Sequence, residues 1–235
     1  MLIRESIEGL FYTQGRGDLR ENEARKTLRI TRKISEKLVR FAFELAHRRK
    51  TSGRGPGRVT CVDKANVFCA FAFFRDTFDE EAARHPTLTA DHAYVDFTAL
   101  RMVENPQGVD VMVSENMFAD ILSDLGARLM RALGLAPSAD IGDDDAVLQP
   151  CLGTAPDIAG QGIAYPFAMF SSAAMMLDWL GDKFDRPQMV TDGERLRLAV
   201  ETVVANDRYL TRDLGGDADT QIATQAVLEK LSAMP

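Results

Sequence analysis

Two aspartates four residues apart carry the clearest chemical signal in this sequence. Asp120 and Asp124 lie in the stretch FADILSD, whose other residues are mostly apolar and follow a helical period. At that spacing, two carboxylates share one helical face and repel each other. A divalent cation bound to both would cancel the repulsion, whereas two solvated aspartates on a surface helix are the alternative interpretation.

Further polar residues follow predicted strands. Lys64 comes after the apolar run at 59–62, and Asp96 comes after the segment HAYV. The carboxyl ends of parallel strands form the ligand-binding edge of open α/β sheets. Because Mg²⁺ prefers carboxylate oxygens from two or three side chains, Asp96 could complete a site with Asp120 and Asp124. A surface lysine after a strand is the alternative interpretation of Lys64.

Three strand–helix units must position these side chains. An amphipathic helix over 31–50, which Thr31 can cap, precedes them, and its basic end leads into a Gly-rich loop up to residue 58. The predicted units are a strand at 59–62 with a helix through 78, a strand-to-helix segment at 92–103, and a strand at 109–113 with a helix over 116–133.

The pattern changes after Gly134. Residues 134–165 are rich in Gly, Pro and Asp, which predicts a long loop with at most one short strand, at 146–149. Helices are predicted at 166–180, 193–205 and 218–233. The order indicates an α/β protein, but the first and last of these helices have apolar faces that need a sheet, and few strands are predicted to supply it.

Composition excludes several classes of function. The chain has 235 residues, a net charge of −7, a pI near 5.1 and 46% apolar residues, so nucleic-acid and membrane partners are not expected. The N-terminus has no signal-peptide pattern, and no apolar run is long enough to span a membrane. Three cysteines without metal-ligand spacing favour a reducing cytoplasm over a disulfide framework.

Several motifs together resemble one enzyme family over essentially the whole chain. They are VDKANV, VDFTALRMV, SENMFADILSDLG, LGLAPSADIGD, GTAPDIAGQGIAYP, SSAAMMLDWLG and RDLGGDADT, and the opening IRESIEGLF is similar to a RENTEG segment. In order and spacing they resemble the β-decarboxylating dehydrogenases, which include the isocitrate, 3-isopropylmalate, homoisocitrate and tartrate/D-malate dehydrogenases. The resemblance implies NAD- and Mg²⁺- or Mn²⁺-dependent oxidative decarboxylation of a 2-hydroxy dicarboxylic acid.

The resemblance also implies a fold. We expect an N-terminally truncated isopropylmalate dehydrogenase-like α/β fold, because family members carry a section ahead of the RENTEG segment that has no counterpart here. That section holds a Gly-rich turn near the nicotinamide and a helix with substrate arginines. Residues 1–133 would form the small substrate-, metal-binding and dimerisation domain, and residues 134–235 the C-terminal half of the large NAD-binding domain.

Site residues follow from the resemblance position by position. Arg4 matches an arginine that binds the substrate carboxylate, and Asn66 matches a residue near substrate and nicotinamide. Lys64 matches the lysine that helps to remove the hydroxyl proton. The metal ligands match Asp96, Asp120 and Asp124. In the family the lysine and the first aspartate reach the site from the partner subunit, so Lys64 and Asp96 imply a homodimer with shared active sites.

The cofactor assignment rests on the segment GTAPDIAGQG, which resembles the family's adenosine-binding loop. Asp157 matches an acidic residue that accepts hydrogen bonds from the ribose hydroxyls and would repel a 2′-phosphate, so NAD is favoured over NADP. The other loop residues expected to contact the cofactor are Gly153, Thr154, Ala155 and Ile158.

The sequence also departs from the family pattern. The position of the catalytic tyrosine holds Phe11, which has no proton to donate, and the neighbouring Tyr12 would face the other way if this segment is extended. The other departures are Leu152 for a histidine, Tyr165 for an asparagine, Ala119 for a glycine and Phe97 for an asparagine. They leave a second hypothesis open: an inactive or regulatory truncated homologue that retains the dimer interface and the metal site.

Overall fold

The computed structural model describes residues 1–130, 135–151, 153–212 and 215–234. The chain forms two compact units, which we call unit 1 (Met1–Gly126) and unit 2 (Ala127–Pro235). The predicted domain boundary, between residues 133 and 134, lies outside the described residues.

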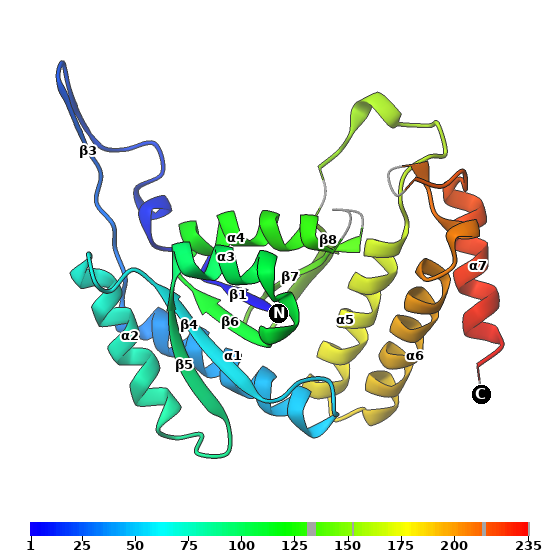
Figure 1. The fold of residues 1–235 in the computed structure, drawn as a ribbon, viewed down its shortest axis with the longest axis horizontal. Coiled ribbons are helices and arrows are strands. Elements are labelled where there is room, and N and C mark those ends of the chain that lie inside the picture. The colour runs from blue at the N-terminus through cyan, green and yellow to red at the C-terminus, as the bar shows by residue number, and fades with distance from the viewer. Residues whose placement is uncertain (131–134, 152, 213–214, 235) are drawn as a thin grey trace. The chain divides into compact units, whose positions relative to one another are not determined.

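Unit 1 is built on a parallel sheet of four strands in the order β1, β6, β4, β5 (Figure 1). The strands are β1 (Leu2–Arg4), β4 (Arg58–Asp63), β5 (Thr89–Tyr94) and β6 (Val111–Ser114). Because all of them run in the same direction, their carboxyl ends lie at one edge of the sheet, where such sheets bind ligands. We call it the carboxyl edge.

Helices cover both faces of this sheet. Helices α1 (Arg32–Thr51) and α2 (Cys69–Ala82) pack on one face, and α3 (Val95–Glu104) and α4 (Asn116–Leu129) pack on the other. Side chains alternate between the faces with the period of a strand. Val59, Cys61, Val111 and Val113 join the core under α1 and α2, whereas Val62 and Met112 join the core under α3 and α4.

The predicted elements of unit 1 are confirmed, with differences at their ends. Helix α2 continues four residues beyond the predicted end at 78, and α4 ends at Leu129, whereas the last three residues of its predicted span lie outside the described residues. The predicted capping hydrogen bond of Thr31 is absent from α1. The Thr31 hydroxyl instead donates to the buried carboxylate of Glu8, at 3.0 Å from Oε1.

A hairpin arm projects from unit 1 and was not predicted. It consists of β2 (Asp18–Arg20) and β3 (Glu23–Arg25), which pair antiparallel and stand away from the rest of unit 1 in Figure 1. The short helix η1 (Leu10–Thr13) precedes the arm, and η2 (Pro106–Gly108) lies between α3 and β6. Each arm strand has only three exposed residues, Asp-Leu-Arg and Glu-Ala-Arg, and such segments are too short and too charged to indicate a strand from their pattern.

Unit 2 contains two strands where at most one was predicted. Strands β7 (Pro137–Ile141) and β8 (Ala146–Pro150) form an antiparallel hairpin, so that prediction was wrong. Pro, Ser and Asp in β7 are typical of turns, but Pro137 stands at the first residue of the strand, where a missing N–H is tolerated.

Three helices complete the described part of unit 2, together with the short helices η4 (Pro156–Ile158) and η5 (Asp207–Tyr209). They are α5 (Phe167–Lys183), α6 (Pro187–Val204) and α7 (Thr220–Ser232), and α6 begins six residues before its predicted start. The hairpin packs against α5, whereas the apolar side of α7 packs on α6, and no sheet is among its main contacts in the described residues. No helix in the described ranges has the length and apolarity that a membrane span requires.

Candidate active site

The carboxyl edge of the unit 1 sheet brings together residues that are far apart in the sequence. Arg4 ends β1, Lys64 directly follows β4, and Asp96 lies in the first turn of α3 after β5. Asn116 begins α4 after β6. The strand order places Arg4 beside the β6–α4 connection and Lys64 beside the β5–α3 connection, which gives two neighbouring groups of side chains.

The first group joins Arg4 to α4. The Arg4 guanidinium donates from Nε and Nη2 to Oδ1 of Asn116, at 3.0 and 2.8 Å, and it forms an ion pair with Asp120. The buried Asn116 in turn donates from Nδ2 to the carbonyl oxygen of Glu8, at 3.1 Å. Sequence reasoning missed Asn116, although a polar residue at the start of a helix behind a strand is a usable signal.

The ion pair with Arg4 partly explains how α4 accommodates two aspartates on one face. The positive charge of Arg4 offsets Asp120, whose side chain is 47% exposed. Asp124 lies one turn further along the helix, is exposed, and has no ion pair or hydrogen bond within the described residues. The two carboxylates therefore still offer free oxygen atoms to a cation.

The second group is the ion pair between Lys64 and Asp96. Nζ of Lys64 lies 2.6 Å from Oδ1 of Asp96, and this hydrogen bond is the main cause that lowers the pKa of the Asp96 carboxyl. The Asp96 side chain is 68% exposed, so it is accessible from outside the chain. Within the described residues of one chain, no three acidic, histidine or cysteine side chains form a group that could hold a metal ion. Asp96 and the two α4 aspartates are therefore not gathered within one chain.

Three buried carboxylates, those of Glu5, Glu8 and Glu115, lie close in sequence to Arg4 or Asn116. Glu5 accepts hydrogen bonds from the backbone N–H groups of Ile7 and Glu8, and Glu8 forms an ion pair with Arg29 at 3.1 Å. Glu115 is 1% exposed, and one of its oxygens, Oε1, accepts from the Phe118 N–H. Burial raises the pKa of the Glu115 carboxyl, and the nearby Glu5 raises it further.

We expect the Glu115→Gln variant to gain stability relative to the parent as the pH rises. A carboxyl whose pKa is higher in the folded state than in the unfolded state holds its proton more tightly when folded. Its stabilising contribution is therefore present at low pH and is lost as the pH rises through the folded-state pKa. Thermal unfolding from pH 4 to 8 measures the difference in Tm between variant and parent, which should grow with pH. The same substitution at the exposed Glu44 should give no such trend.

Phe11 and Tyr12 occupy different surroundings. The segment is the short helix η1 and not extended, so the condition under which Tyr12 would face away from Phe11 is not met. The Phe11 ring centroid lies 5.9 Å from the Arg4 guanidinium carbon, whereas the Tyr12 ring lies against Arg29, at 3.4 Å. The aromatic ring near Arg4 therefore has no hydroxyl group.

Other family positions in unit 1 lie as follows. Asn66 and Phe97 are exposed, and neither lies within a buried site in the single chain. Ala119 is fully buried on α4, so the methyl group that replaces the expected glycine hydrogen packs inside unit 1.

The predicted adenosine-binding loop lies in unit 2. Ala155 has a left-handed backbone (φ 40°) just before η4, and Gly160 and Gly162 also have positive φ angles. Thr220 at the start of α7 donates its N–H to the Gly162 carbonyl at 2.8 Å, which anchors the end of the loop. Gly153, Thr154 and Asp157 are exposed, and Ile158 is half-buried.

Two departures from the family pattern fall in this unit. Tyr165 packs edge-on against Phe167, with ring centroids 4.7 Å apart, and both belong to the helical core of unit 2. Leu152 lies outside the described residues.

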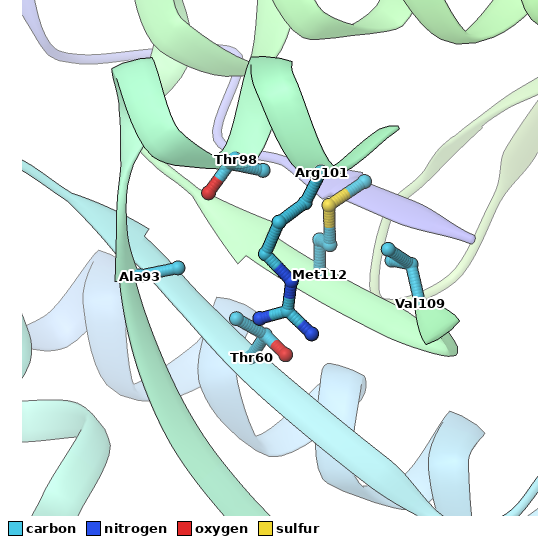
Figure 2. A pocket seen from close by; sticks show the side chains of 6 residues that line it. All are labelled: Thr60, Ala93, Thr98, Arg101, Val109 and Met112. Atoms are coloured by element: carbon cyan, nitrogen blue, oxygen red, sulfur yellow. The ribbon is translucent and has the colours of Figure 1, made fainter. Parts of the chain in front are cut away.

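A small cavity between α3 and the sheet is not a substrate site. Figure 2 shows the Arg101 side chain extending across it toward Thr60. Its volume of about 10 Å³ is close to that of one water-sized probe. The remaining residues that line it are Ala93, Thr98, Val109 and Met112.

Comparison with known proteins agrees with the resemblance seen in the motifs. The isocitrate/isopropylmalate dehydrogenase family pattern matches residues 1–231. The chain is 41% identical to homoisocitrate dehydrogenase of Methanocaldococcus jannaschii over 97% of its own length and 61% of that protein's. It is 41% identical to isocitrate/homoisocitrate dehydrogenase of Thermus thermophilus over 100% of its own length and 66% of that protein's.

The fold agrees with that of solved members. The crystal structure of isocitrate dehydrogenase from Methylococcus capsulatus superimposes with a TM-score of 0.84 at 36% identity, covering 98% of this chain and 66% of that one. The chain thus spans less than two thirds of these proteins and has the corresponding part of their fold. The protein belongs to the isocitrate/isopropylmalate dehydrogenase family, the β-decarboxylating dehydrogenases.

Proposed function

We propose that the chain takes part in NAD- and divalent-metal-dependent oxidative decarboxylation of a 2-hydroxy dicarboxylic acid of the 3-isopropylmalate, D-malate/tartrate or isocitrate type. The observation that carries the proposal is the carboxyl edge, where Arg4, Asn116 and Asp120 form one linked group and Lys64 and Asp96 form the other. Arg4, Asp120, Lys64 and Asp96 are at positions that the family motifs assign to chemistry, and Asn116 links Arg4 to the start of α4.

The side chains present suit the proposed roles. Arg4 offers a planar fork of donors, the geometry that recognises a substrate carboxylate. Asp120 and Asp124, with Asp96, supply the carboxylate oxygens that Mg²⁺ or Mn²⁺ prefers. The cation would supply Lewis-acid stabilisation of the negative charge that decarboxylation leaves on the substrate oxygen. Lys64 would help to remove the proton from the substrate hydroxyl, with Asp96 holding the Lys64 Nζ atom in place.

The proposed cofactor is NAD, which would accept the hydride from C2 of the substrate. The exposed Asp157 carboxylate in unit 2 would accept hydrogen bonds from the adenosine ribose hydroxyls and repel the 2′-phosphate of NADP. Asn66 would lie near substrate and nicotinamide, and Gly153, Thr154, Ala155 and Ile158 would line the adenosine side. Three free cysteines suit a reducing cytoplasm.

A homodimer with shared sites would bring the three aspartates together. Apolar side chains are exposed on the outer sides of α3 and α4, and such a surface is typical of an interface. They are Phe97, Leu100, Val103 and Ile121. These helices also carry Asp96, Asp120 and Asp124, so pairing through them would place the metal ligands of two chains close to each other.

Leu100→Glu is expected to convert the dimer into a monomer. A charge in the centre of an apolar interface must be desolvated without a partner, which costs several kcal/mol. Size-exclusion chromatography with light scattering should show twice the chain mass of 26.0 kDa for the parent and a single mass for the variant. Leu198→Glu, at a similarly exposed leucine on α6, is the matched control and should stay dimeric. A dimeric Leu100→Glu protein would contradict the assignment of this surface.

The experiment that tests the function is a direct assay of NADH formation. The purified chain is incubated with NAD⁺, Mn²⁺ and, separately, 3-isopropylmalate, isocitrate, homoisocitrate, D-malate and tartrate, and the Lys64→Met variant purified in parallel reports any host enzyme. We expect turnover of at least one substrate by the parent alone. No turnover with any of them would overturn the catalytic proposal. If the chain still binds Mn²⁺ and forms a dimer, the lack of turnover would support the hypothesis of a non-catalytic homologue. The position of Phe11 near Arg4 also favours that hypothesis.

A further inference from the structure

A carboxylate directly ahead of Lys64 is buried within unit 1. Asp63 is the last residue of β4, and its side chain is 0% exposed. Its Oδ1 accepts a hydrogen bond from the Ala65 N–H at 2.8 Å, so the carboxylate holds the backbone on both sides of Lys64. A charge at this depth requires a close partner of opposite sign.

That partner comes from α2. Arg75 donates from Nε to Oδ2 of Asp63 at 2.8 Å and from Nη2 to Oδ1 at 2.7 Å, which is a two-pronged pair. Its side chain is 24% exposed, and the hydrogen bond to Asp63 is the main cause that raises the pKa of the guanidinium. Arg75 therefore ties α2 to the end of β4.

Arg75 also reaches the neighbouring strand. The register of β4 and β5 places Tyr94 directly opposite Asp63. The Arg75 guanidinium carbon lies 5.3 Å from the centroid of the Tyr94 ring, and Nζ of Lys64 lies 5.6 Å from the same centroid. Both distances are within the range of cation–π attraction, so one ring contacts two cations.

From these contacts we propose that Arg75 is a positioning residue that sets the geometry of the Lys64–Asp96 pair. It fixes the backbone around Lys64 through Asp63, and it fixes the ring against which the Lys64 ammonium lies. Tyr94 also immediately precedes α3, which carries Asp96 in its first turn. Within the described residues, no hydrogen bond or ion pair joins Arg75 to Lys64 or Asp96. The importance of Arg75 for catalysis rests on the proposed function of Lys64, whereas its effect on the geometry does not.

A purely structural ion pair would have a different consequence, and the chain offers a comparison. Arg197 and Asp178 in unit 2 form a similar two-pronged pair, at 2.7 and 3.0 Å, and the Arg197 side chain is also 24% exposed. Arg197→Gln thus removes a two-pronged pair of similar geometry, whose carboxylate is partly exposed, without touching the carboxyl edge. It is the matched control for Arg75→Gln.

The test follows the Lys64 side chain by NMR. In the dimeric full chain with ¹³C-labelled lysine, the Lys64 Hε–Cε signal is identified by its loss in Lys64→Gln. Ring-current shift from Tyr94 should displace the signal from those of exposed lysines, and Tyr94→Leu should abolish the displacement. We expect Arg75→Gln to remove more than half of the displacement of the Lys64 signal at constant pH. Arg75→Lys should remove less of it because lysine keeps the charge. Arg197→Gln should leave the displacement unchanged.

The outcomes separate positioning from simple stabilisation. An unchanged Lys64 signal in folded Arg75→Gln protein would overturn the proposal, even if its Tm falls as much as that of Arg197→Gln. If Arg75→Gln does not fold, Arg75→Lys decides, since an unchanged signal there would also contradict positioning. The NMR result does not depend on turnover, so it stands if the proposed function fails. Where turnover is measured, Arg75→Gln should lower kcat at least about tenfold with KM nearly unchanged.

Discussion

Asp120→Asn is expected to lower the affinity of the dimer for Mn²⁺ at least about 100-fold, since a direct carboxylate ligand contributes more than the supporting residues behind it. Its effect on folding should be small, because the substitution removes both the repulsion from Asp124 and the exposed ion pair with Arg4. Isothermal titration calorimetry with Mn²⁺ measures the affinity, and thermal unfolding measures the stability.

The control for this variant is Asp192→Asn. Asp192 is likewise a partly exposed helical aspartate that pairs with an arginine, Arg195, at 3.4 Å. Its substitution should leave Mn²⁺ affinity unchanged. Parent-like affinity in Asp120→Asn would show that α4 does not carry the metal ligands.

Asp63→Ala is expected to destabilise unit 1 by about 3 kcal/mol, the lower end of the cost of breaking a buried pair. The variant leaves the Arg75 guanidinium without its carboxylate and the Ala65 N–H without its acceptor. Asp178→Ala, at the partly exposed partner of Arg197, should cost only about 1 kcal/mol, because water can replace the lost contacts.

The two units allow the effect of Asp63→Ala to be located. The single tryptophan, Trp179, lies on α5, so its fluorescence reports on unit 2. Amide hydrogen exchange of β4 reports on unit 1. We expect faster exchange in β4 with an unchanged fluorescence transition. Parent-like protection in β4 would show that Asp63 contributes little to the stability of unit 1.

The units that begin with β4 and β6 were predictable because these two strands are largely apolar and buried. Strand β4 has five consecutive buried residues from Val59 to Asp63, and such a run between turn residues is typical of a sheet covered on both faces. The hairpin arm and β7 carry charged and turn-forming residues, so their pairing depends on neighbours that periodicity does not reveal. For α6, Pro187 in the first turn was a usable signal for an earlier start.

The candidate site was predictable to the extent that strand ends define it. Lys64 and Asp96 follow neighbouring parallel strands, so the shared edge brings them together. The contributions of Asn116, Asp63 and Arg75 were not predicted, because each acts through a contact with a residue at least ten positions away. Residue type alone does not identify such contacts, since an aspartate in a strand or an arginine in a helix most often lies in solvent.

The central claim is a metal site built from Asp96 of one chain and Asp120 and Asp124 of its partner. It is tested most directly by mixing the Asp96→Asn and Asp120→Asn chains after unfolding and refolding them together. Random pairing makes half of the dimers mixed, and each mixed dimer has one complete site. Four chains form two dimers, of which one is mixed on average, so the mixture contains about one complete site per four chains. We predict that calorimetry will recover that fraction of parent-like Mn²⁺ binding, while each variant alone has none. No recovery in the mixture, with mixed dimers demonstrated by mass spectrometry, would contradict a site shared between chains.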